Sequence, residues 1–383
     1  MARYKLEDIF DLQMGKTPSR NNPEYWDSCD NKWISIGDLT QAGKYVTDTK
    51  EYISDLAVEE SGIKLIPANT VVMSFKLSIG KTAITSGEMY SNEAIMAFHD
   101  KHVVDLIPEY IYYMFKYKNW DEGTNKAVMG KTLNKATLSK VEIEVCPFEK
   151  QKEIVELLDK VSAILEERND ELQKLDDLIK ARFVEMFGDP ITNPMGWKKE
   201  ETNKHIDLLS GYPFKSEQYV EDGINICGGL TIMPQRIEWD NCVHWPSLEG
   251  YEEYLLNEGD IVMALDRPWI TEGFKVARID ANHLPALLIQ RTARIRAIDI
   301  DQDYLYYCFI NGGFDKHSNV TGSLVPHISA KDIRSFEIMI PPVELQKEFS
   351  LFMKQVDKSK VAVQSALDKA QLLFDSLMQQ YFG

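Results

Sequence analysis

Three Gly-Lys-Thr tripeptides begin at Gly15, Gly80 and Gly130, and each could belong to a loop that binds the phosphates of a nucleotide. Such a loop needs another glycine five positions earlier, so that the backbone can wrap around the phosphates. Those three positions hold Phe10, Phe75 and Asn125. The tripeptides are therefore interpreted as turn residues, not as a nucleotide site.

Two other kinds of catalytic centre also lack their defining residues. An adenine methyltransferase needs a glycine-rich cofactor turn and an Asn/Asp-Pro-Pro-aromatic tetrad that holds the flipped base. The nearest strings, at 22–25 and 193–196, are incomplete, and no Gly-x-Gly turn accompanies them. His99 and His102 form a lone His-x-x-His without a nearby third ligand, so we expect a surface pair and no metal site. No nucleophile with a paired base can be identified either. The sequence thus predicts a chain that binds its target without catalysis of its own.

The composition is that of a folded, acidic protein of two or three domains, 383 residues long. Lys and Arg number 43 against 60 Asp and Glu, and the net charge of −17 excludes a generally cationic, nucleic-acid-coating surface. The five cysteines are scattered without Cys-x-x-Cys spacing, which is typical of a reducing compartment. No stretch approaches the roughly 20 apolar residues of a membrane span. We expect a soluble, cytoplasmic protein.

The sequence repeats itself with a period near 195 residues. Residues 147–154 match 342–349, and Phe187-Gly188 pairs with Phe382-Gly383 at the same offset. Further upstream, 33–40 resembles 224–231, and 105–115 resembles 299–309. The chain is therefore interpreted as a tandem duplication in which each copy has a globular part and a helix. The globular parts, 1–148 and 189–342, are expected to contain strands at 70–74, 141–145 and 260–264 and a helix at 108–118.

The two helical segments, 149–187 and 343–382, contain no Gly or Pro, while prolines stand just before them and a glycine just after each. Proline before a helix and glycine after it are start and stop signals. At 1.5 Å per residue each helix would be roughly 55 to 60 Å long. A helix of this length needs a partner, and the shared pattern of the two copies predicts that the helices pair antiparallel.

Apolar residues form a heptad seam along both segments. In the second segment the expected seam is Phe349, Phe352, Val356, Val363, Ala366, Ala370, Leu373 and Leu377, with Ser359 filling one step. In the first it is Ile154, Leu157, Val161 and Ile164, after which Arg168 and Glu171 fall on seam positions and the pattern resumes one residue later at Leu172, Leu175 and Ile179. This shift predicts a register break or local unwinding near Arg168.

A tandem repeat of a globular half, a Pro-x-x-x-Gln-Lys-Glu-Ile/Phe string and a long helix resembles the specificity subunit of type I restriction-modification systems. The resemblance covers essentially the whole chain. Its most specific points are Pro147 with Gln151, Pro342 with Gln346, the strings 33–40 and 224–231, and the terminal Phe-Gly of each helix. The family usually has Glu-Gln where this chain has Lys150-Gln151 and Leu345-Gln346.

The resemblance implies an α+β fold with a pseudo-two-fold internal repeat. It implies target recognition domains at 1–148 and 189–342, each reading one half of a bipartite site on double-stranded DNA, and spacer helices at 149–188 and 343–383 that pair as an antiparallel coiled coil. It also implies no catalysis and no cofactor in this chain. Two methyltransferase subunits would bind S-adenosylmethionine and methylate adenine, sometimes together with translocase-nuclease subunits. No membrane partner is implied.

A strongly acidic chain is poorly suited to gripping phosphates, so its partners are expected to supply much of the cationic channel. Local polar and basic loops remain as candidates for base and phosphate contacts. In the first half these are Lys16, Thr17, Ser19, Arg20, Lys76, Ser78, Lys81, Lys126, Lys131 and Asn134. In the second half they are Tyr212, Lys215, Ser216, Arg267, Trp269, Gln290, Arg291, Lys316, His317, Ser323 and His327.

Two alternatives to a DNA specificity subunit remain open at this point. The main alternative is a coiled-coil adaptor whose globular halves bind protein or carbohydrate. The other is a self-contained methyltransferase or nuclease.

Overall fold

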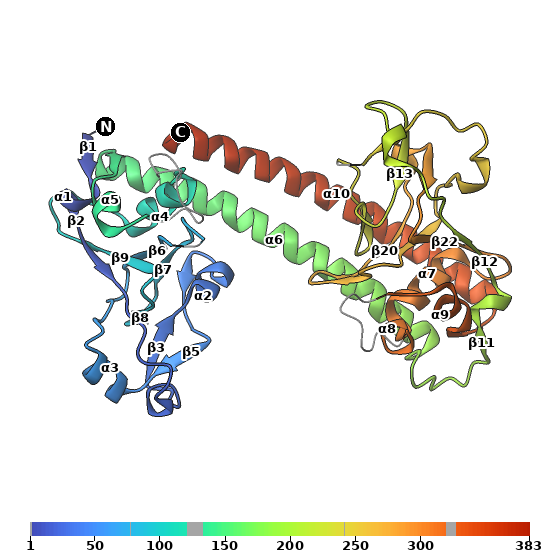
Figure 1. Cartoon of the computed structure of the whole chain (residues 1–383), viewed down its shortest axis with the longest axis horizontal. Helices are drawn as coiled ribbons and strands as arrows, with labels where there is room; N and C mark the ends of the chain where they lie inside the picture. The colour runs from blue at the N-terminus through green and yellow to red at the C-terminus, as the bar shows by residue number, and fades with distance from the viewer. Residues whose placement is uncertain (1, 77, 121–132, 241, 319–326) are drawn as a thin grey trace. The chain divides into compact units, whose positions relative to one another are not determined.

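The computed structural model describes residues 2–76, 78–120, 133–240, 242–318 and 327–383 (Figure 1). Its contacts divide the chain into two units. Unit 1 comprises Met1–Asn169 and Ser365–Gly383, and unit 2 comprises Asp170–Gln364. Each unit therefore combines one globular part with a segment of both long helices.

Unit 1 contains a five-stranded sheet in the order β2-β9-β6-β7-β4, a three-stranded sheet in the order β5-β3-β8, and the pair β1-β10. The strands are β1 (Ala2–Lys5), β2 (Phe10–Met14), β3 (Asn31–Ile34), β4 (Tyr45–Val46), β5 (Glu51–Ile53), β6 (Val71–Ser74), β7 (Thr82–Thr85), β8 (Tyr90–Ser91), β9 (Ile95–Asp100) and β10 (Glu142–Val145). The helices are α1 (Leu6–Ile9), α2 (Ile36–Gln41), α3 (Asp55–Ser61), α4 (Pro108–Tyr117) and α5 (Lys135–Ser139), and the long helix α6 (Phe148–Phe187) begins here.

Unit 2 contains a four-stranded sheet in the order β12-β22-β17-β20, a three-stranded sheet in the order β16-β13-β21, and the pairs β11-β23, β14-β15 and β18-β19. The strands are β11 (Lys199–Glu201), β12 (Ile206–Ser210), β13 (Ile224–Cys227), β14 (Ile232–Met233), β15 (Arg236–Ile237), β16 (His244–Trp245), β17 (Ile261–Ala264), β18 (Trp269–Ile270), β19 (Gly273–Phe274), β20 (Val276–Arg278), β21 (Ala286–Leu288), β22 (Thr292–Ala297) and β23 (Glu337–Met339). The helices are α7 (Gln302–Asn311), α8 (Phe314–His317), α9 (Ala330–Ser335) and the first part of α10 (Val343–Phe382).

The larger sheets of the two units share a four-stranded topology, to which unit 1 adds β4, parallel to β7. The order β2-β9-β6-β7 corresponds to β12-β22-β17-β20, and every neighbouring pair in both is antiparallel. In the three-stranded sheets, β3 and β13 each have one antiparallel and one parallel neighbour. The predicted α+β fold and internal duplication are thus confirmed.

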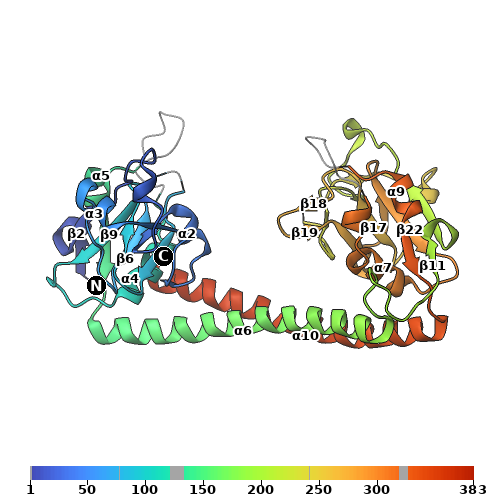
Figure 2. The ribbon, with the colours of Figure 1, turned by 90° about the horizontal axis from the view of Figure 1, so that it is seen from below.

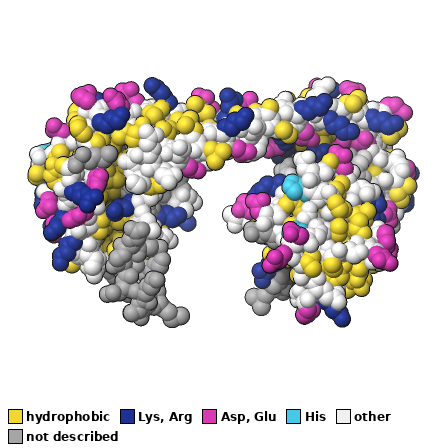
Figure 3. All heavy atoms as spheres, turned by 90° about the horizontal axis from the view of Figure 1, so that it is seen from above, with side chains coloured by type: hydrophobic (Ala, Val, Ile, Leu, Met, Phe, Trp, Pro, Cys, Tyr) yellow, Lys and Arg dark blue, Asp and Glu magenta, His cyan; other side chains and the backbone are white. Residues whose placement is uncertain are grey.

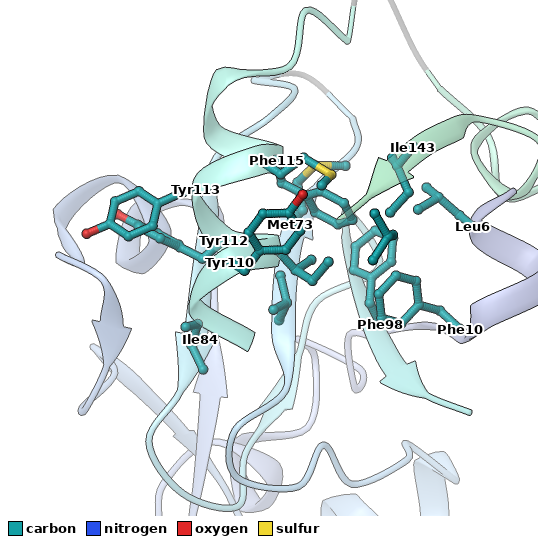
Figure 4. Packing of buried hydrophobic residues seen from close by; sticks show 14 of the residues in the cluster. Leu6, Phe10, Met73, Ile84, Phe98, Tyr110, Tyr112, Tyr113, Phe115 and Ile143 are labelled. Carbon is teal, nitrogen blue, oxygen red and sulfur yellow. The ribbon is translucent and has the colours of Figure 1, made fainter. Parts of the chain in front are cut away.

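In each unit an aromatic helix lies between the larger sheet and the long helices (Figure 2). In unit 1 this helix is α4, whose Phe115 ring lies edge-on to Phe98 of β9 with centroids 4.8 Å apart. Tyr110 and Tyr113 of the same helix are fully buried (Figure 4). The neighbouring tyrosines of α4 and α7 therefore belong to the core that fixes each globular part to its helices.

The glutamine of the repeated Pro-x-x-x-Gln string ties each long helix to its globular part. Gln151 is fully buried, accepts a hydrogen bond from the backbone N–H of Ile107 (3.0 Å) and donates to the carbonyls of Asp105 (2.9 Å) and Cys146 (3.0 Å). Gln346 accepts from the N–H of Asp301 (2.8 Å) and donates to the carbonyl of Pro341 (2.8 Å). Both amides thus join the first turn of the long helix to the segment before the aromatic helix.

The long helices are antiparallel in each unit. In unit 1 the beginning of α6 shares its core with the end of α10, where Phe374 and Phe382 contact Tyr113 and Tyr110. In unit 2 the end of α6 meets the beginning of α10, with the rings of Phe183 and Phe349 5.4 Å apart. The predicted antiparallel pairing is confirmed.

The predicted seam is wrong at several of its positions, although Leu172, Leu175 and Ile179 of α6 lie on it as predicted. Leu158 and Met353 are fully buried, whereas the predicted seam residues Ile164 and Leu373 are 43% and 51% exposed. The seam instead follows steps of four and then three. At these places two large apolar residues are adjacent in the sequence, as at Phe352 and Met353, and a one-dimensional pattern cannot tell which of them faces the core.

The predicted register break near Arg168 is also wrong. Helix α6 is continuous from Phe148 to Phe187. With steps of four and three, the half-buried and buried positions Ile154, Leu158, Val161, Leu165, Arg168, Leu172, Leu175 and Ile179 form one uninterrupted heptad repeat. The break was a consequence of choosing Leu157 and Ile164 as seam residues.

Candidate nucleic-acid interface

Loops from different parts of the sequence meet at one end of the sheets in unit 1, and we call them the unit 1 loop cluster: residues 15–20, 75–76, 78–81, 91–94 and 133–134. Lys16 donates its backbone N–H to the carbonyl of Ser91 (2.8 Å), and Phe75 donates to Ala94 (2.9 Å). Leu133 in turn donates to Phe75 (3.2 Å). Backbone hydrogen bonds thus fix the loops to one another without using their side chains.

The same connections occur in unit 2, and we call residues 211–216, 265–275, 289–291 and 327–328 the unit 2 loop cluster. Tyr212 donates its N–H to Leu288 (3.0 Å), Leu265 donates to Arg291 (2.9 Å), and Ile328 donates to Leu265 (2.8 Å). Each bond has a counterpart in unit 1. The duplication therefore extends to the loops that carry most of the predicted binding residues.

One glycine in each unit permits this arrangement. A Cβ atom on Gly15 would lie 2.2 Å from the carbonyl oxygen of Asn92, and one on Gly211 would lie 2.0 Å from that of Ile289. Neither backbone oxygen can move away cheaply, so both positions require glycine. Gly15 was visible in the sequence as the start of a Gly-Lys-Thr tripeptide, but the close approach that explains both glycines was not.

In unit 1, Arg20 is held by both an acid and an aromatic pair. Its guanidinium makes two hydrogen bonds to Glu51 (2.5 and 3.0 Å) and lies 3.7 Å from the ring centre of Trp26 and 5.0 Å from that of Trp33. The paired hydrogen bonds raise the pKa of Arg20 and lower that of Glu51. Arg20 therefore presents an ordered, stacked cation at the surface.

A second acid, Glu93, organises the rest of the unit 1 loop cluster. The hydroxyl of Thr17 donates a hydrogen bond to Glu93 and lowers its pKa, and the charges of Lys76 and Arg20 act in the same direction. Lys16 is exposed, and its ammonium donates to the carbonyl of Ser61 (2.5 Å). The cluster thus brings together five predicted residues, Lys16, Thr17, Ser19, Arg20 and Lys76, next to Ser78 and Lys81 of the same loops.

In unit 2 the loop cluster borders a pocket of about 480 Å³. Three predicted residues line it: Arg267, Gln290 and Arg291. Asp266 forms an ion pair with Arg291 (3.0 Å) and a hydrogen bond with His327 (2.6 Å). A fourth predicted residue, His327, therefore lies at the edge of the pocket. Residues 228–231 after β13 and Lys275 before β20 also line it.

Lys275 lines this pocket, and sequence reasoning did not propose it. It is only 7% exposed, and its ammonium donates to the carbonyl of Gly229. Burial lowers the pKa of this lysine. A signal was present in the repeat, because Lys275-Val276-Ala277 follows the strand 261–264 as Lys81-Thr82-Ala83 follows the strand 71–74.

Several predicted residues of unit 2 do not line this pocket. Trp269 stacks on Phe274 (4.9 Å between centroids), and the ring of Tyr212 packs among Phe214, Tyr251 and Tyr254. His317 hydrogen bonds to the carbonyl of Asp332 and the hydroxyl of Ser335, both at 3.1 Å. Lys316 lies with His317 at a different pocket, next to Pro190 and Phe336. Lys215 and Ser216 are exposed on the short helix Ser216–Gln218 and the residue before it.

Four predicted residues remain, of which one caps a helix and three lie outside the described ranges. Asn134 caps α5 by accepting a hydrogen bond from the N–H of Thr137 (2.8 Å), as Ser329 caps the equivalent α9 by accepting from Asp332. Three predicted residues, Lys126, Lys131 and Ser323, lie outside the described residues.

The surface has no single basic patch on the face seen in Figure 3, where acidic and basic side chains are interspersed. Within the ranges that the structure describes, no group of three or more His, Cys, Asp and Glu side chains could hold a metal ion. In the same ranges no helix is both long and apolar enough to span a membrane.

Residues 1–174 and 229–370 match the model of a protein family described as the type I restriction modification DNA specificity domain. The chain belongs to this family. The comparisons lend no support to the alternative of an adaptor that binds protein or carbohydrate.

Relatives of this specificity-domain protein include the type I restriction enzyme MjaIX specificity subunit of Methanocaldococcus jannaschii, with 24% identity over 93% of this chain and 88% of the relative. The EcoAI specificity subunit of Escherichia coli is 33% identical over 44% of this chain and 29% of its own length. Among solved structures, the S subunit of a type I restriction-modification system from M. genitalium superposes with a TM-score of 0.57 at 13% identity, covering 100% of this chain and 96% of that one. This last likeness supports the fold.

Proposed function

We propose that the chain is the DNA-reading subunit of a type I restriction-modification complex and that it recognises a two-part site on double-stranded DNA. The carrying observation is that both units present the same set of loops on the same sheet topology, in a chain of the DNA specificity family. Two equivalent loop clusters suit a site with two separate parts. We assign one part to residues 1–148 and the other to 189–342, with 149–188 and 343–383 as the helical spacer.

The proposal gives the chemistry to other subunits. The sequence lacks the cofactor turn and the base-holding tetrad of an adenine methyltransferase. We therefore propose that two methyltransferase subunits bind S-adenosylmethionine and that this chain brings them to their site, with translocase-nuclease subunits added in a restricting complex. This division also fits the charge, because a chain of net charge −17 needs cationic partners to hold a phosphate backbone.

The test is an exchange of one recognition part. Residues 1–148 are replaced by the equivalent part of a relative with a different site, and the hybrid is co-expressed with its methyltransferase subunits. Methylation mapping of the host genome should show that one half of the modified site has changed and that the other half and their separation are kept. A change in both halves would contradict the modular assignment.

A second experiment separates binding from catalysis. Labelled S-adenosylmethionine should bind to the complex with methyltransferase subunits and not to the chain alone. The same complex should retard duplex DNA that carries the mapped site. Cofactor binding by the isolated chain would favour a self-contained methyltransferase, and absence of DNA retardation by the complex would refute the proposed function.

A further inference from the structure

Lys81 and Lys275 occupy the same position in the two units. Each lies immediately before the strand that follows β6 or β17 in the order of the larger sheet, β7 or β20. The carbonyl of Lys81 accepts a hydrogen bond from the N–H of Ser74 at the end of β6 (2.9 Å), and that of Lys275 accepts from Ala264 at the end of β17 (3.0 Å). The duplicated fold therefore brings one lysine per unit to its loop cluster.

The surroundings of Lys275 do not satisfy its charge. An ammonium group has three N–H donors, and the described residues supply a single acceptor, the carbonyl of Gly229. No described carboxylate forms an ion pair with Lys275 or with Lys81. A buried cation without a counter-ion is costly unless a ligand supplies the missing charge.

Basic residues outnumber acidic ones among the described residues that line the pocket around Lys275. Arg267 and Arg291 line it, whereas Asp266 is the one carboxylate among the described lining residues. Both arginines have positive φ angles, 46° and 63°, in a region that non-glycine residues seldom adopt. Strained backbone at a binding surface is consistent with side chains held for a ligand. The lining of the pocket is therefore suited to bind an anion.

Lys81 is placed in the same way on a more open surface. It is half-buried, and Gly80 before it has a φ of +89° with the Trp120 ring 3.0 Å from the position of a Cβ atom. The backbone N–H of Lys81 donates to the hydroxyl of Ser74 (3.1 Å), and this bond fixes the backbone from which the lysine side chain extends. Both lysines therefore project from a fixed backbone at an equivalent point.

We propose that Lys81 and Lys275 each bind a phosphate of the DNA backbone, one in each half of the site, and so set the position of each recognition domain on the duplex. This proposal rests on the proposed function and adds the ligand of these two side chains. Phosphate contacts position a protein on DNA without reading its sequence. The lysines should consequently contribute to affinity and not to the choice of bases.

The test uses the full chain in complex with its methyltransferase subunits and a duplex that carries the mapped site. Binding is measured at several salt concentrations for Lys275→Met and Lys81→Met. Each substitution should weaken binding about tenfold, as expected for the loss of a charged hydrogen bond. Each should also reduce the slope of log K against log salt by about 0.9, the value for one phosphate contact. Methylation mapping should return the parent site.

Matched controls lie at the opposite end of the same sheets. Lys204, which pairs with Glu200 before β12, and Lys101, which follows β9 and pairs with Asp11, are changed to Met. These variants should keep the parent affinity and salt slope. Lys275→Arg keeps the charge and should recover part of the lost affinity.

The melting temperature distinguishes a loss of DNA contact from a loss of folding. Because Lys275→Met removes an unpaired buried charge, its melting temperature should equal or exceed that of the parent, and Lys81→Met provides the same test at a more exposed position. Parent-like affinity and salt slope in both variants would overturn the proposal, and so would a changed methylation site, which would indicate base reading. Failure of the parent complex itself to bind a specific duplex would refute the proposed function and this inference with it.

Discussion

The two globular parts share a framework and differ in the chemistry of their loop clusters. In unit 1 the exposed cation Arg20 is paired with Glu51, and the polar groups Thr17 and Glu93 bond to each other. In unit 2 a largely apolar pocket surrounds Lys275. Residues 1–148 carry a net charge of −4 and residues 189–342 one of −9. Because backbone hydrogen bonds hold the loops in both, their side chains are free to differ, as two different half-sites would require.

The units also differ in the ion pairs that connect each globular part to the long helices. In unit 2, Arg278 of β20 bonds to Asp303 of α7 (2.7 Å) and Asp357 of α10 (2.8 Å). Burial alone would lower the pKa of Arg278, but Asp357, Tyr306 and Asp303 reverse this and raise it. In the described part of unit 1 the ion pair between Lys44 and Asp159 of α6 takes this role. The attachment in unit 2 is thus the more buried and the more dependent on one residue.

The largest effect is expected for Arg278→Met. The change leaves Asp357 without this partner and Asp303 with only the more distant Lys354 (3.9 Å) among the described residues, and breaking such a largely buried arrangement typically costs about 4 kcal/mol. Lys44→Met should cost about 1 kcal/mol, because Asp159 is 40% exposed and keeps the hydroxyl of Tyr113 as a donor. Native-state hydrogen exchange of β17 and β6 would report on each unit separately. Lys354→Met, which removes a more distant and exposed partner of Asp303, is the control. Equal losses in the two units would contradict the difference described above.

The next largest effects test the corrected helix seam, and they should be alike in the two units. Leu158→Ala and Met353→Ala remove equivalent, fully buried side chains and should each destabilise their unit by about 3 kcal/mol. Leu157→Ala and Phe352→Ala, one residue earlier, alter half-buried side chains and should cost clearly less. Urea unfolding followed by helix circular dichroism provides the measurement. A larger loss at 157 and 352 would restore the seam expected from the sequence.

Substitution of the buried glutamines should have an intermediate effect. Gln151→Met and Gln346→Met keep the side-chain volume but leave buried backbone groups unsatisfied, which should cost about 2 kcal/mol in each unit. Gln151 makes three hydrogen bonds and Gln346 two, so the loss in unit 1 should be the larger. The melting temperatures of the two variants, measured side by side, would test this order. A larger loss for Gln346→Met than for Gln151→Met would contradict the expectation that each hydrogen bond contributes equally.

The smallest effect concerns pH in unit 2. Hydrogen bonds from Lys198 and Lys204 lower the pKa of Glu200 to about 2. Because this value lies below the ordinary 4.5, the pairs stabilise the fold above pH 4.5, and their contribution is lost as the pH falls through 2. Glu200→Gln should therefore reduce the loss of stability on acidification, and Lys198→Met should reduce it in part. Urea midpoints measured between pH 5 and pH 2 would test this, with an unchanged pH profile as the contrary result.

The sequence predicted the features that depend on repetition and on long uniform patterns. Both helices, the duplication and the α+β class follow from the 195-residue period and from segments without Gly or Pro. The strand at 71–74 and the aromatic helix at 108–117 also formed close to their expected bounds. These elements are specified by local patterns that need no knowledge of partners.

The candidate site was less predictable, because it is made by tertiary contacts. Lys275 looks like an ordinary strand-edge lysine until the loop at Gly229 is seen to cover it. The hydrogen bonds of His317 to α9 could not be read from the sequence either. The seam failed for a related reason, since adjacent apolar residues differ only in which one meets the core. Selecting such side chains requires the distances between loops that a linear pattern does not contain.

The glutamine at the start of each long helix has a consequence for how such chains can diversify. All the groups that Gln151 and Gln346 contact through their amides are backbone N–H and carbonyl groups. A joint that recognises only the main chain accepts any side chains around it. A globular part exchanged at this boundary would therefore keep this joint whatever its own side chains there, provided that it also packs aromatic side chains against the long helices as α4 and α7 do.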